Sequence, residues 1–251
     1  MLNIVIPMAG RGSRFIKAGF TDPKPLIKIN KKFMIEGVIN NLKPLKKTNK
    51  HRFIFICQKD HIERYDLKTK LKEYSKNCII IEIKEITEGA ACTVLLAEEL
   101  INNDDELMIA NSDQWINILI DDYIEYQKRN KLDGLIMTME DIDPKWSFIR
   151  FSKDRKKILE IVEKKVVSNE ATVGIYNFRK GSFFCSSARN MIKKNQRVNG
   201  EFYVAPVYNE MIKNNKNIGI YNVGKLNEKM FGLGTPEDLK IFKSLKISRD
   251  F

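Results

Sequence analysis

The sequence has few of the residues that usually build metal and redox sites. Its two histidines, His51 and His61, are interpreted as surface or structural residues, because two imidazoles are too few for a metal cluster. The four cysteines stand far apart and form no Cys-x-x-Cys pair: Cys57, Cys78, Cys92 and Cys185. The first three stand among apolar residues and are expected to be buried thiols, whereas the surroundings of the fourth give no clear indication. This spacing argues against a zinc site and against a disulfide framework.

Long hydrophobic runs are also missing. No apolar stretch approaches the roughly 20 residues that a membrane-spanning helix needs. The first three residues carry no basic side chain ahead of a short apolar run, which is unlike a secretory signal peptide. We therefore expect a cytoplasmic protein without a membrane partner. Hydrophobic residues make up 43% of the chain and charged residues 30%, which predicts a folded core rather than disorder.

The net charge of +12 raises the question of nucleic-acid binding. The basic residues are spread along the chain, lysine dominates arginine, and Asn and Ile are plentiful, so a lysine-rich composition explains much of the excess. RNA-binding aromatic motifs, zinc-finger spacing and a basic amphipathic helix are all missing from the sequence. We expect a general attraction for polyanionic nucleotides, and no nucleic-acid partner.

Apolar runs and helical spacing alternate along the first half of the chain. Buried strands are expected at 4–6, 53–57, 78–83 and 106–110, with a short edge strand at 27–30. Helices are expected at 34–42, 59–76 and 91–100. After Gly134 the strands follow one another with mostly short connections, at 135–139, 148–151, 158–162 and 172–176. The pattern predicts an α/β fold, Rossmann-like and doubly wound, with a mostly parallel mixed sheet and a partly antiparallel second lobe.

Residues 2–26 organise the rest of the chain. A short buried strand ends at Pro7 and is followed by the small residues of the run Ala9-Gly10-Arg11-Gly12-Ser13. Two cations follow, Arg14 and Lys24, the second of them between two prolines that stiffen the backbone. Glycines let backbone N–H groups approach an anion closely, so a phosphate chain is the expected ligand. The loop lacks the Gly-Lys-(Ser/Thr) of a Walker loop and matches only part of Gly-x-Gly-x-x-Gly, so neither of those readings fits well.

The segments PMAGRGSRF and KAGFTDPKPL together resemble the signature of the sugar-phosphate nucleotidyltransferases, of the MobA-like NTP-transferase type. The Phe15 and KAGF variant is most similar to the capsule-biosynthesis branch of that family. The alternative is a strand, a turn and a solvated basic loop that only look alike. The resemblance extends, in five segments in the right order, from Ile4 to about Leu239. It implies one domain over 1–251, with a nucleotide-binding lobe at 1–133 and an acceptor-binding lobe at 134–251; no linker rich in Pro, Gly or Ser separates the two.

The resemblance also implies a set of residues on the nucleotide side. Residues around the triphosphate would be Met8, Ala9, Gly10, Arg11, Gly12 and Ser13. The segment 86–93 resembles the family's Gly-Thr-Ala segment, so Gly89 and Ala90 would let the base lie against the backbone, with Gln58 as a weaker candidate. The alternative for this segment is an ordinary helix start capped by Thr87.

Asp113 stands directly after the predicted strand at 106–110, where parallel α/β sheets bind their ligands. A carboxylate there is well placed to hold Mg²⁺, which takes one or two carboxylates together with phosphate oxygens and water. The family has a metal-binding Asp at this point, so the resemblance implies Mg²⁺ as cofactor. The alternative is an Asp that caps a following helix.

The acceptor side follows from three later segments. Val-Glu-Lys-Lys at 162–165 resembles the family's Val-Glu-Lys-Pro, which implies that Glu163 binds acceptor hydroxyls and Lys164 binds the acceptor phosphate. Gly174 would make room for the ring, and Glu201 and Tyr203 match an acidic and aromatic acceptor segment. Without the resemblance, the charges at 163 and 164 would be interpreted as a solvated pair.

One departure concerns Gly232, which stands where the family often has a second metal-binding Asp ahead of Gly-Thr-Pro. Either Asp113 holds Mg²⁺ with fewer protein ligands, or another carboxylate compensates. Thr235 with Pro236 behind it predicts a capped helix start.

The resemblance implies a nucleotidyltransferase that moves NMP from an NTP to a sugar 1-phosphate or similar small phosphorylated acceptor and releases pyrophosphate, in capsule or surface polysaccharide biosynthesis. Arg14, Lys24 and Asp113 would be its catalytic residues. CTP or UTP is favoured as the NTP, although backbone contacts do not choose among the four bases, and a homo-oligomer is compatible with the sequence. The alternatives are a GT-A-type glycosyltransferase, which would want Asp-x-Asp where this chain has Asn111-Ser112-Asp113, and a non-catalytic nucleotide- or nucleic-acid-binding module.

Overall fold

A nine-stranded sheet runs through both halves of the chain, which the computed structural model describes over residues 1–251. Its strands are β1 (Leu2–Pro7), β4 (His51–Gln58), β5 (Ile79–Ile83), β6 (Glu106–Ala110), β8 (Gly134–Glu140), β9 (Ser147–Phe151), β10 (Ile158–Glu163), β11 (Glu170–Phe178) and β12 (Ile218–Lys225). Neighbours run in the order β10-β9-β11-β6-β1-β4-β5, and β8 pairs with both β11 and β12. The strands β5, β4, β1 and β6 are parallel, whereas β11 is antiparallel to β6, β8 and β9. The predicted mixed and mostly parallel α/β sheet is confirmed.

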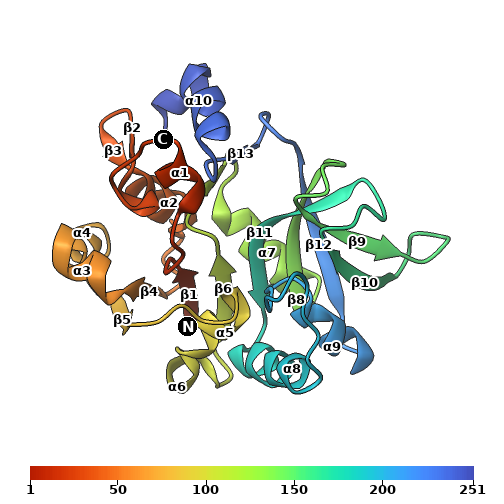
Figure 1. Ribbon diagram of the computed structural model, residues 1–251. Helices are drawn as coiled ribbons and strands as arrows, with labels where there is room; N and C mark the ends of the chain where they lie inside the picture. The colour runs from red at the N-terminus through yellow and green to blue at the C-terminus, as the bar shows by residue number, and fades with distance from the viewer.

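Helices cover both faces of this sheet (Figure 1). They are α1 (Ser13–Lys17), α2 (Met34–Leu42), α3 (Lys59–Tyr65), α4 (Leu67–Tyr74), α5 (Ala90–Leu95), α6 (Glu98–Ile101), α7 (Ile120–Arg129), α8 (Gly181–Lys193), α9 (Val207–Lys213) and α10 (Pro236–Ser244), with 3₁₀ turns at Lys24–Leu26 and Lys246–Arg249. One cluster of 31 buried residues packs α2, α4 and α7 against the sheet, and another of 26 packs α5, α8 and α9. Two cores of similar size on opposite faces are the doubly wound arrangement that the alternation predicted.

Two predicted helices are each divided in two. The helix predicted at 59–76 breaks at Asp66, which adopts left-handed backbone angles (φ 47°) that Asp tolerates better than most residues. The helix predicted at 91–100 breaks after Leu95, where the N–H groups of the next two residues bond back to Thr93 and Val94 and tighten the turn. Apolar spacing continues across the second break, so periodicity alone did not reveal it. At the first break the apolar stripe changes sides, from Ile62 and Tyr65 to Leu67 and Leu71, a signal that the sequence analysis did not use.

The cysteine prediction was partly wrong. Cys57 and Cys185 are buried, and burial raises the pKa of each thiol to about 12. Cys78 and Cys92 are half-buried rather than buried. All four are free thiols, as the spacing predicted.

A third hydrophobic cluster of ten buried residues joins the two ends of the chain. It holds Phe15 from α1 together with Trp115, Phe231, Phe242 and Phe251. Trp115 lies on β7 (Gln114–Ile116), which pairs antiparallel with β13 (Met230–Gly232), while β2 (Lys28–Ile29) and β3 (Lys32–Phe33) form a second small sheet. The pairing of β7 with β13 brings residues from the end of the chain beside the segment that follows β6.

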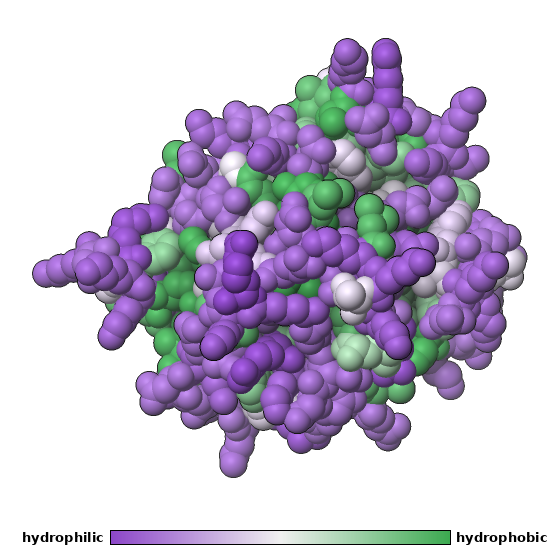
Figure 2. Space-filling model, turned by 180° about the vertical axis from the view of Figure 1, so that it is seen from behind, coloured by the Kyte–Doolittle hydropathy of each residue, from purple (hydrophilic) through white to green (hydrophobic).

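Figure 1 shows α10 and the C-terminus beside α1 and α2, far from them in sequence. The ring of Phe251 packs so closely on Gly37 that a Cβ there would lie 2.1 Å from it, and the Nζ of Lys32 donates to the Phe251 carbonyl. The predicted capped start of α10 is confirmed, because the Thr235 side chain accepts a hydrogen bond from the Asp238 N–H. The face shown in Figure 2 is mostly hydrophilic, with hydrophobic residues in small separate patches. Every helix is too short or too polar to cross a membrane.

Candidate functional site

The opening loop, residues 8–13, connects β1 to α1. Gly12 has φ 63°, a left-handed conformation that favours glycine, and an added Cβ would make only an ordinary contact of 3.5 Å with the Cβ of Lys24. Gly10 faces open space, with no atom within 4 Å of an added Cβ. The loop is held from the neighbouring strand, because the Nε2 of Gln58 donates to the Ala9 carbonyl at 2.6 Å. Gln58 therefore contacts the loop and supports it from behind.

Lys24 and Asp113 meet although 89 residues separate them. The Lys24 Nζ lies 2.8 Å from the Asp113 Oδ2, and each side chain is about a quarter exposed. The prolines on either side of Lys24 hold it in a 3₁₀ turn. Asp113 does not cap a helix, since strand β7 follows it. The alternative interpretation of Asp113 as a helix cap is thus wrong. Its ion pair with Lys24 was not predicted from the sequence, which placed both side chains beside a shared ligand.

A cavity of about 460 Å³, here called the main cavity, brings together eight of the predicted site residues. From both halves of the chain it is lined by Arg14, Ala90, Asp113, Glu163, Lys164, Gly174, Glu201 and Tyr203. A smaller cavity of about 220 Å³ adjoins it and is lined by five predicted residues, which are Ala9, Gly10, Gly89, Ala90 and Glu201. Ala90 and Glu201 line both cavities, so the two spaces are neighbours. The nucleotide-side and acceptor-side predictions therefore converge on one place.

Six predicted residues line neither cavity. Three act through a neighbour: Lys24 contacts Asp113, Gln58 contacts Ala9, and Gly12 lies against Lys24. The side chain of Met8 is buried and its N–H donates to a β4 carbonyl, which leaves only its carbonyl oxygen for a ligand. Arg11 and Ser13 are exposed beside the loop.

Glu163 and Lys164 are not a solvated ion pair. The Ser147 hydroxyl donates to the Glu163 carboxylate, and the Lys164 Nζ donates to the Tyr203 hydroxyl and lies 4.6 Å from the centre of that ring. Burial raises the pKa of Glu163 above its ordinary value; the hydrogen bond from Ser147 and the charge of Lys164 lower it, and the charge of Glu201 raises it. Both side chains are thus held at the wall of the main cavity.

Two glycines permit close approaches at the site. Gly174 has φ 81°, and a Cβ there would lie 2.3 Å from the Nδ2 of Asn111, so the glycine makes room for that amide as well as for any ligand. Gly89 has φ 127°, and its Cβ would lie 2.5 Å from the carbonyl oxygen of Phe202. Phe202 also bonds through its backbone to Glu88 and Ala91. The nucleotide segment and the acceptor segment are therefore in direct backbone contact.

Thr87 does not cap α5. Its hydroxyl bonds instead to the Gly89 carbonyl at 3.0 Å and to the Thr93 hydroxyl at 2.5 Å, and the helix has no side-chain cap. The ordinary capped helix start is thus not what the structure shows for this segment. Thr87 and Thr93 both line the small cavity.

The sequence analysis missed several residues of the main cavity, which are Lys145, Trp146, Ser147, Thr172 and Tyr176. Lys145 and Trp146 precede β9 and Ser147 is its first residue, whereas the sequence predicted only the apolar part of that strand. The Lys145 Nζ lies 3.4 Å from Asp143, 4.0 Å from Asp238 and 4.9 Å from the Trp146 ring centre. A signal was available, since Trp146 is one of only two tryptophans and stands beside a lysine between two predicted strands.

The structure contains no group of three or more side chains able to hold a metal ion. Asp113 is one of the three carboxylates that line the main cavity, and Gly234 leaves it room, because a Cβ there would lie 2.6 Å from the Asp113 Oδ2. The carboxylate nearest to Gly232 is that of Asp238, 3.5 Å from where a Cβ would stand. One carboxylate with phosphate oxygens and water is a donor set that suits Mg²⁺.

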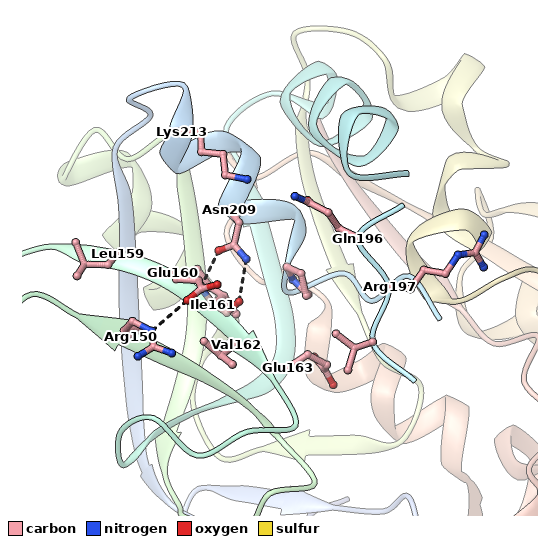
Figure 3. Close-up of a pocket in the computed structure, with 12 residues that line it drawn as sticks. Arg150, Leu159, Glu160, Ile161, Val162, Glu163, Gln196, Arg197, Asn209 and Lys213 are labelled. Carbon is pink, nitrogen blue, oxygen red and sulfur yellow. Dashed lines mark hydrogen bonds and ion pairs between the residues drawn. The ribbon is translucent and has the colours of Figure 1, made fainter. Parts of the chain in front are cut away.

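A second cavity of about 480 Å³ lies on the other side of β10 and shares Glu163 with the main cavity (Figure 3). Its polar groups bind one another. The Asn209 amide bonds to both the N–H and the carbonyl of Ile161 at 2.7 and 2.9 Å, and Arg150 pairs with Glu160 at 3.1 Å. Asn209 thereby satisfies the outward backbone groups of an edge strand, so we interpret this cavity as structural.

A sequence model of the nucleotidyl transferase family matches residues 4–218. The chain belongs to the nucleotidyl transferase family. This confirms the resemblance at the level of the family, and the match covers both the opening loop and the acceptor-side segment at 162–165.

Relatives of this nucleotidyl transferase are similar at low identity. Mannose-1-phosphate guanylyltransferase catalytic subunit beta of Dictyostelium discoideum is 24% identical over 187 residues, which are 70% of this chain and 49% of that protein. The bifunctional protein GlmU of Methanococcus aeolicus is 25% identical over 242 residues, which are 95% of this chain and 53% of that protein. The chain spans about half the length of these curated relatives.

Solved structures share the fold of this nucleotidyl transferase. The nucleoside-diphosphate-sugar pyrophosphorylase from Vibrio cholerae RC9 has a TM-score of 0.80 at 24% identity, covering 96% of this chain and 100% of that one. The inositol-1-phosphate CTP transferase from T. maritima has a TM-score of 0.71 at 15% identity, covering 94% of this chain and 90% of that one.

Proposed function

We propose that the protein transfers a nucleotidyl group from an NTP to a sugar 1-phosphate, or a similar small phosphorylated acceptor, and releases pyrophosphate. The observation that carries this proposal is the main cavity, in which Arg14 and Asp113 from the first half face Glu163 and Lys164 from the second. The matched family and the names of the relatives support the same reaction class. The nucleotide-binding and acceptor-binding lobes would then be parts of one domain that share the nine-stranded sheet.

In the proposed reaction an oxygen of the acceptor phosphate attacks the α-phosphorus of the NTP in line. A new phosphorus–oxygen bond to the acceptor forms as the bond between the α-phosphorus and the leaving pyrophosphate breaks. An ionised phosphate is already a nucleophile, so no general base is required, and catalysis rests on alignment and charge neutralisation.

The residues of the cleft supply these two effects. Arg14 would bind the β- and γ-phosphates with forked hydrogen bonds, and the amides of the opening loop would hold the triphosphate. Lys24, which stands 2.8 Å from Asp113, would stabilise charge on the α-phosphate. Glu163 would accept hydrogen bonds from acceptor hydroxyls, and Lys164 would contact the acceptor phosphate.

Mg²⁺ is proposed as the cofactor, held by Asp113 together with phosphate oxygens and water. When bound, the ion would neutralise charge on the reacting phosphate oxygens. The room that Gly234 leaves beside the Asp113 carboxylate supports this assignment. No second protein carboxylate is required for a magnesium ion that binds largely through its substrate.

The deciding experiment measures pyrophosphate release with CTP, UTP, GTP and dTTP against a panel of sugar 1-phosphates and other small phosphomonoesters. We expect release that requires both an NTP and an acceptor, with CTP or UTP preferred. No release with any pair would contradict the proposal. Sugar transfer from a nucleotide-sugar would instead indicate a glycosyltransferase, and steep salt-dependent RNA binding without NTP turnover would indicate a nucleic-acid-binding module.

The KAGF variant of the opening signature supports a further proposal, that the nucleotide product serves capsule or surface polysaccharide synthesis. The proposed substrates are cytoplasmic metabolites, which supports a cytoplasmic location. Deletion of the gene followed by analysis of surface polysaccharide tests this role separately from the reaction.

A further inference from the structure

We propose that Ser147 is a positioning residue, which holds one oxygen of the Glu163 carboxylate so that the other oxygen is presented to the acceptor. This inference rests on the proposed function, because it assigns a role within the acceptor part of the main cavity. Neither the resemblance nor the comparisons assign any role to this serine.

The geometry begins with strand register. β9 and β10 are antiparallel, and their pairing places Glu163 directly opposite Ser147. Directly opposed residues have their Cβ atoms about 5 Å apart on the same face of a sheet, which is the reach of a serine hydroxyl to a glutamate carboxylate. The hydroxyl donates to the Glu163 Oε2, and both residues line the main cavity.

The serine is fixed more firmly than the glutamate. Ser147 is buried, with 6% of its surface exposed, and its short side chain leaves the first residue of β9, whereas Glu163 is only half-buried. Glu163 is the last residue of its strand, and the chain turns directly after it at Lys164, which has φ 53°. A long side chain at the end of a strand has several rotamers, so a bond to a buried hydroxyl selects one of them. The free protein thus already holds the carboxylate in place.

Polar groups from every neighbouring element face this carboxylate. Tyr176 on β11 bonds through its hydroxyl to the Thr172 hydroxyl at 3.0 Å. Burial, and then the charge of Glu163, raise the pKa of the Tyr176 phenol, so it stays protonated. The charge of Lys164 favours ionised Glu163, and that of Glu201 opposes it.

Ser147 is the neutral donor in this group, and its hydrogen bond favours the ionised carboxylate. Removing the hydroxyl therefore raises the pKa of Glu163 further. An acid whose pKa rises is protonated over a wider range, and a protonated carboxyl is a poorer acceptor of hydroxyl hydrogen bonds. As the pH is lowered, acceptor binding should then be lost at a higher pH in the variant than in the wild type.

The test is Ser147→Ala, with acceptor kinetics measured as a function of pH. We expect the acceptor KM to rise about tenfold, as for the loss of one hydrogen bond to a charged group. The KM for the NTP and kcat should stay within about twofold of the wild type. The acid limb of the acceptor kcat/KM profile should move to higher pH, and a ¹³C NMR titration should show the same direction for the Glu163 carboxyl.

Two further variants separate positioning from a structural effect. Ser147→Thr keeps a hydroxyl and should restore the acceptor KM and the pH profile. In a Glu163→Gln background, Ser147→Ala should add little, because the group that it positions has lost its charge. Ser168→Ala is the matched control. It removes another serine hydroxyl, from the connection between β10 and β11, that donates to the Ile149 carbonyl at 2.7 Å. This variant should leave acceptor kinetics unchanged.

The outcomes distinguish this inference from the proposed function. Turnover by the wild type together with an unchanged acceptor KM and pH profile in Ser147→Ala would overturn the positioning role alone. An equal effect of Ser147→Ala in the wild type and in the Glu163→Gln background would overturn it too. Absence of turnover with every phosphorylated acceptor would overturn both.

Discussion

The nucleotide side and the acceptor side of the cleft are built in opposite ways. On the nucleotide side, Arg11 and Arg14 are exposed, form no ion pair, and flank a loop whose Gly10 faces open space. On the acceptor side, Glu163 and Lys164 already have polar partners within the protein. The first region leaves these two arginines unpaired for a highly charged ligand, although its Lys24 is paired with Asp113, whereas the second holds its groups in place in advance.

This difference agrees with the chemistry of the two proposed ligands. A triphosphate brings several negative charges, so unpaired cations contribute much binding free energy and need no closely fitting pocket. A sugar phosphate is recognised largely by hydroxyl hydrogen bonds, which depend on orientation and reject misplaced partners. We therefore expect substitutions on the nucleotide side to act mainly through charge, and those on the acceptor side mainly through position.

The largest effect should come from the Lys24–Asp113 ion pair, which belongs to the proposed nucleotide side. Lys24→Ala and Asp113→Asn should each lower turnover by about a hundredfold or more, because each removes charge stabilisation at the reacting phosphate. Both residues are partly exposed, so thermal unfolding should show a folded protein in each case. Steady-state pyrophosphate release measures the loss, and near-normal turnover in both variants would refute the proposed mechanism.

A smaller effect is expected where the two sides touch. Gly89→Ala places a Cβ about 2.5 Å from the backbone of Phe202 in a conformation that favours glycine. The free energy of unfolding should fall by about 2 kcal/mol or more. Gly10→Ala, with no atom within 4 Å, is the matched control and should change it by less than about 0.5 kcal/mol. Chemical denaturation compares the two, and equal stabilities would contradict the close contact.

The smallest effect is expected for Arg14, an exposed cation beside the opening loop. Arg14→Met should lower kcat/KM for the NTP by about tenfold or more, since it removes charge-assisted hydrogen bonds to phosphate. Stability should not change, because Arg14 forms no ion pair in the free protein. Lys17→Met, on the same helix and exposed, controls for the loss of general positive charge. An equal decrease in both variants would show that Arg14 acts only through long-range attraction.

Much of the nucleotide side could be predicted from the sequence, because its features are local. The helix at 34–42 and the strand at 106–110 were predicted with their observed bounds. Local apolar periodicity is enough to predict both elements. The convergence of Arg14 and Asp113 followed from the rule that ligands bind where parallel strands end.

The acceptor side was less accessible because its contacts depend on pairing between strands. The bond from Ser147 to Glu163 exists only in one register of β9 against β10, and a shift by one residue would turn the serine to the other face. The contact of Gly174 with Asn111 likewise joins residues 63 positions apart in the chain. The alternation of apolar and polar side chains locates such strands, but it does not predict which residues of two paired strands lie opposite each other.

The pairing of β13 with β7 has a consequence for how the protein tolerates shortening. The family match ends at residue 218, yet the Leu233 N–H donates to the Asp113 carbonyl at 2.8 Å and Gly234 borders its carboxylate. A truncated chain that stops after residue 218 would lose the segment at 232–236 and with it the backbone contact behind Asp113, the proposed magnesium ligand. The residues after 218 thus support the proposed site from behind, and a boundary drawn at the end of the family match would remove that support.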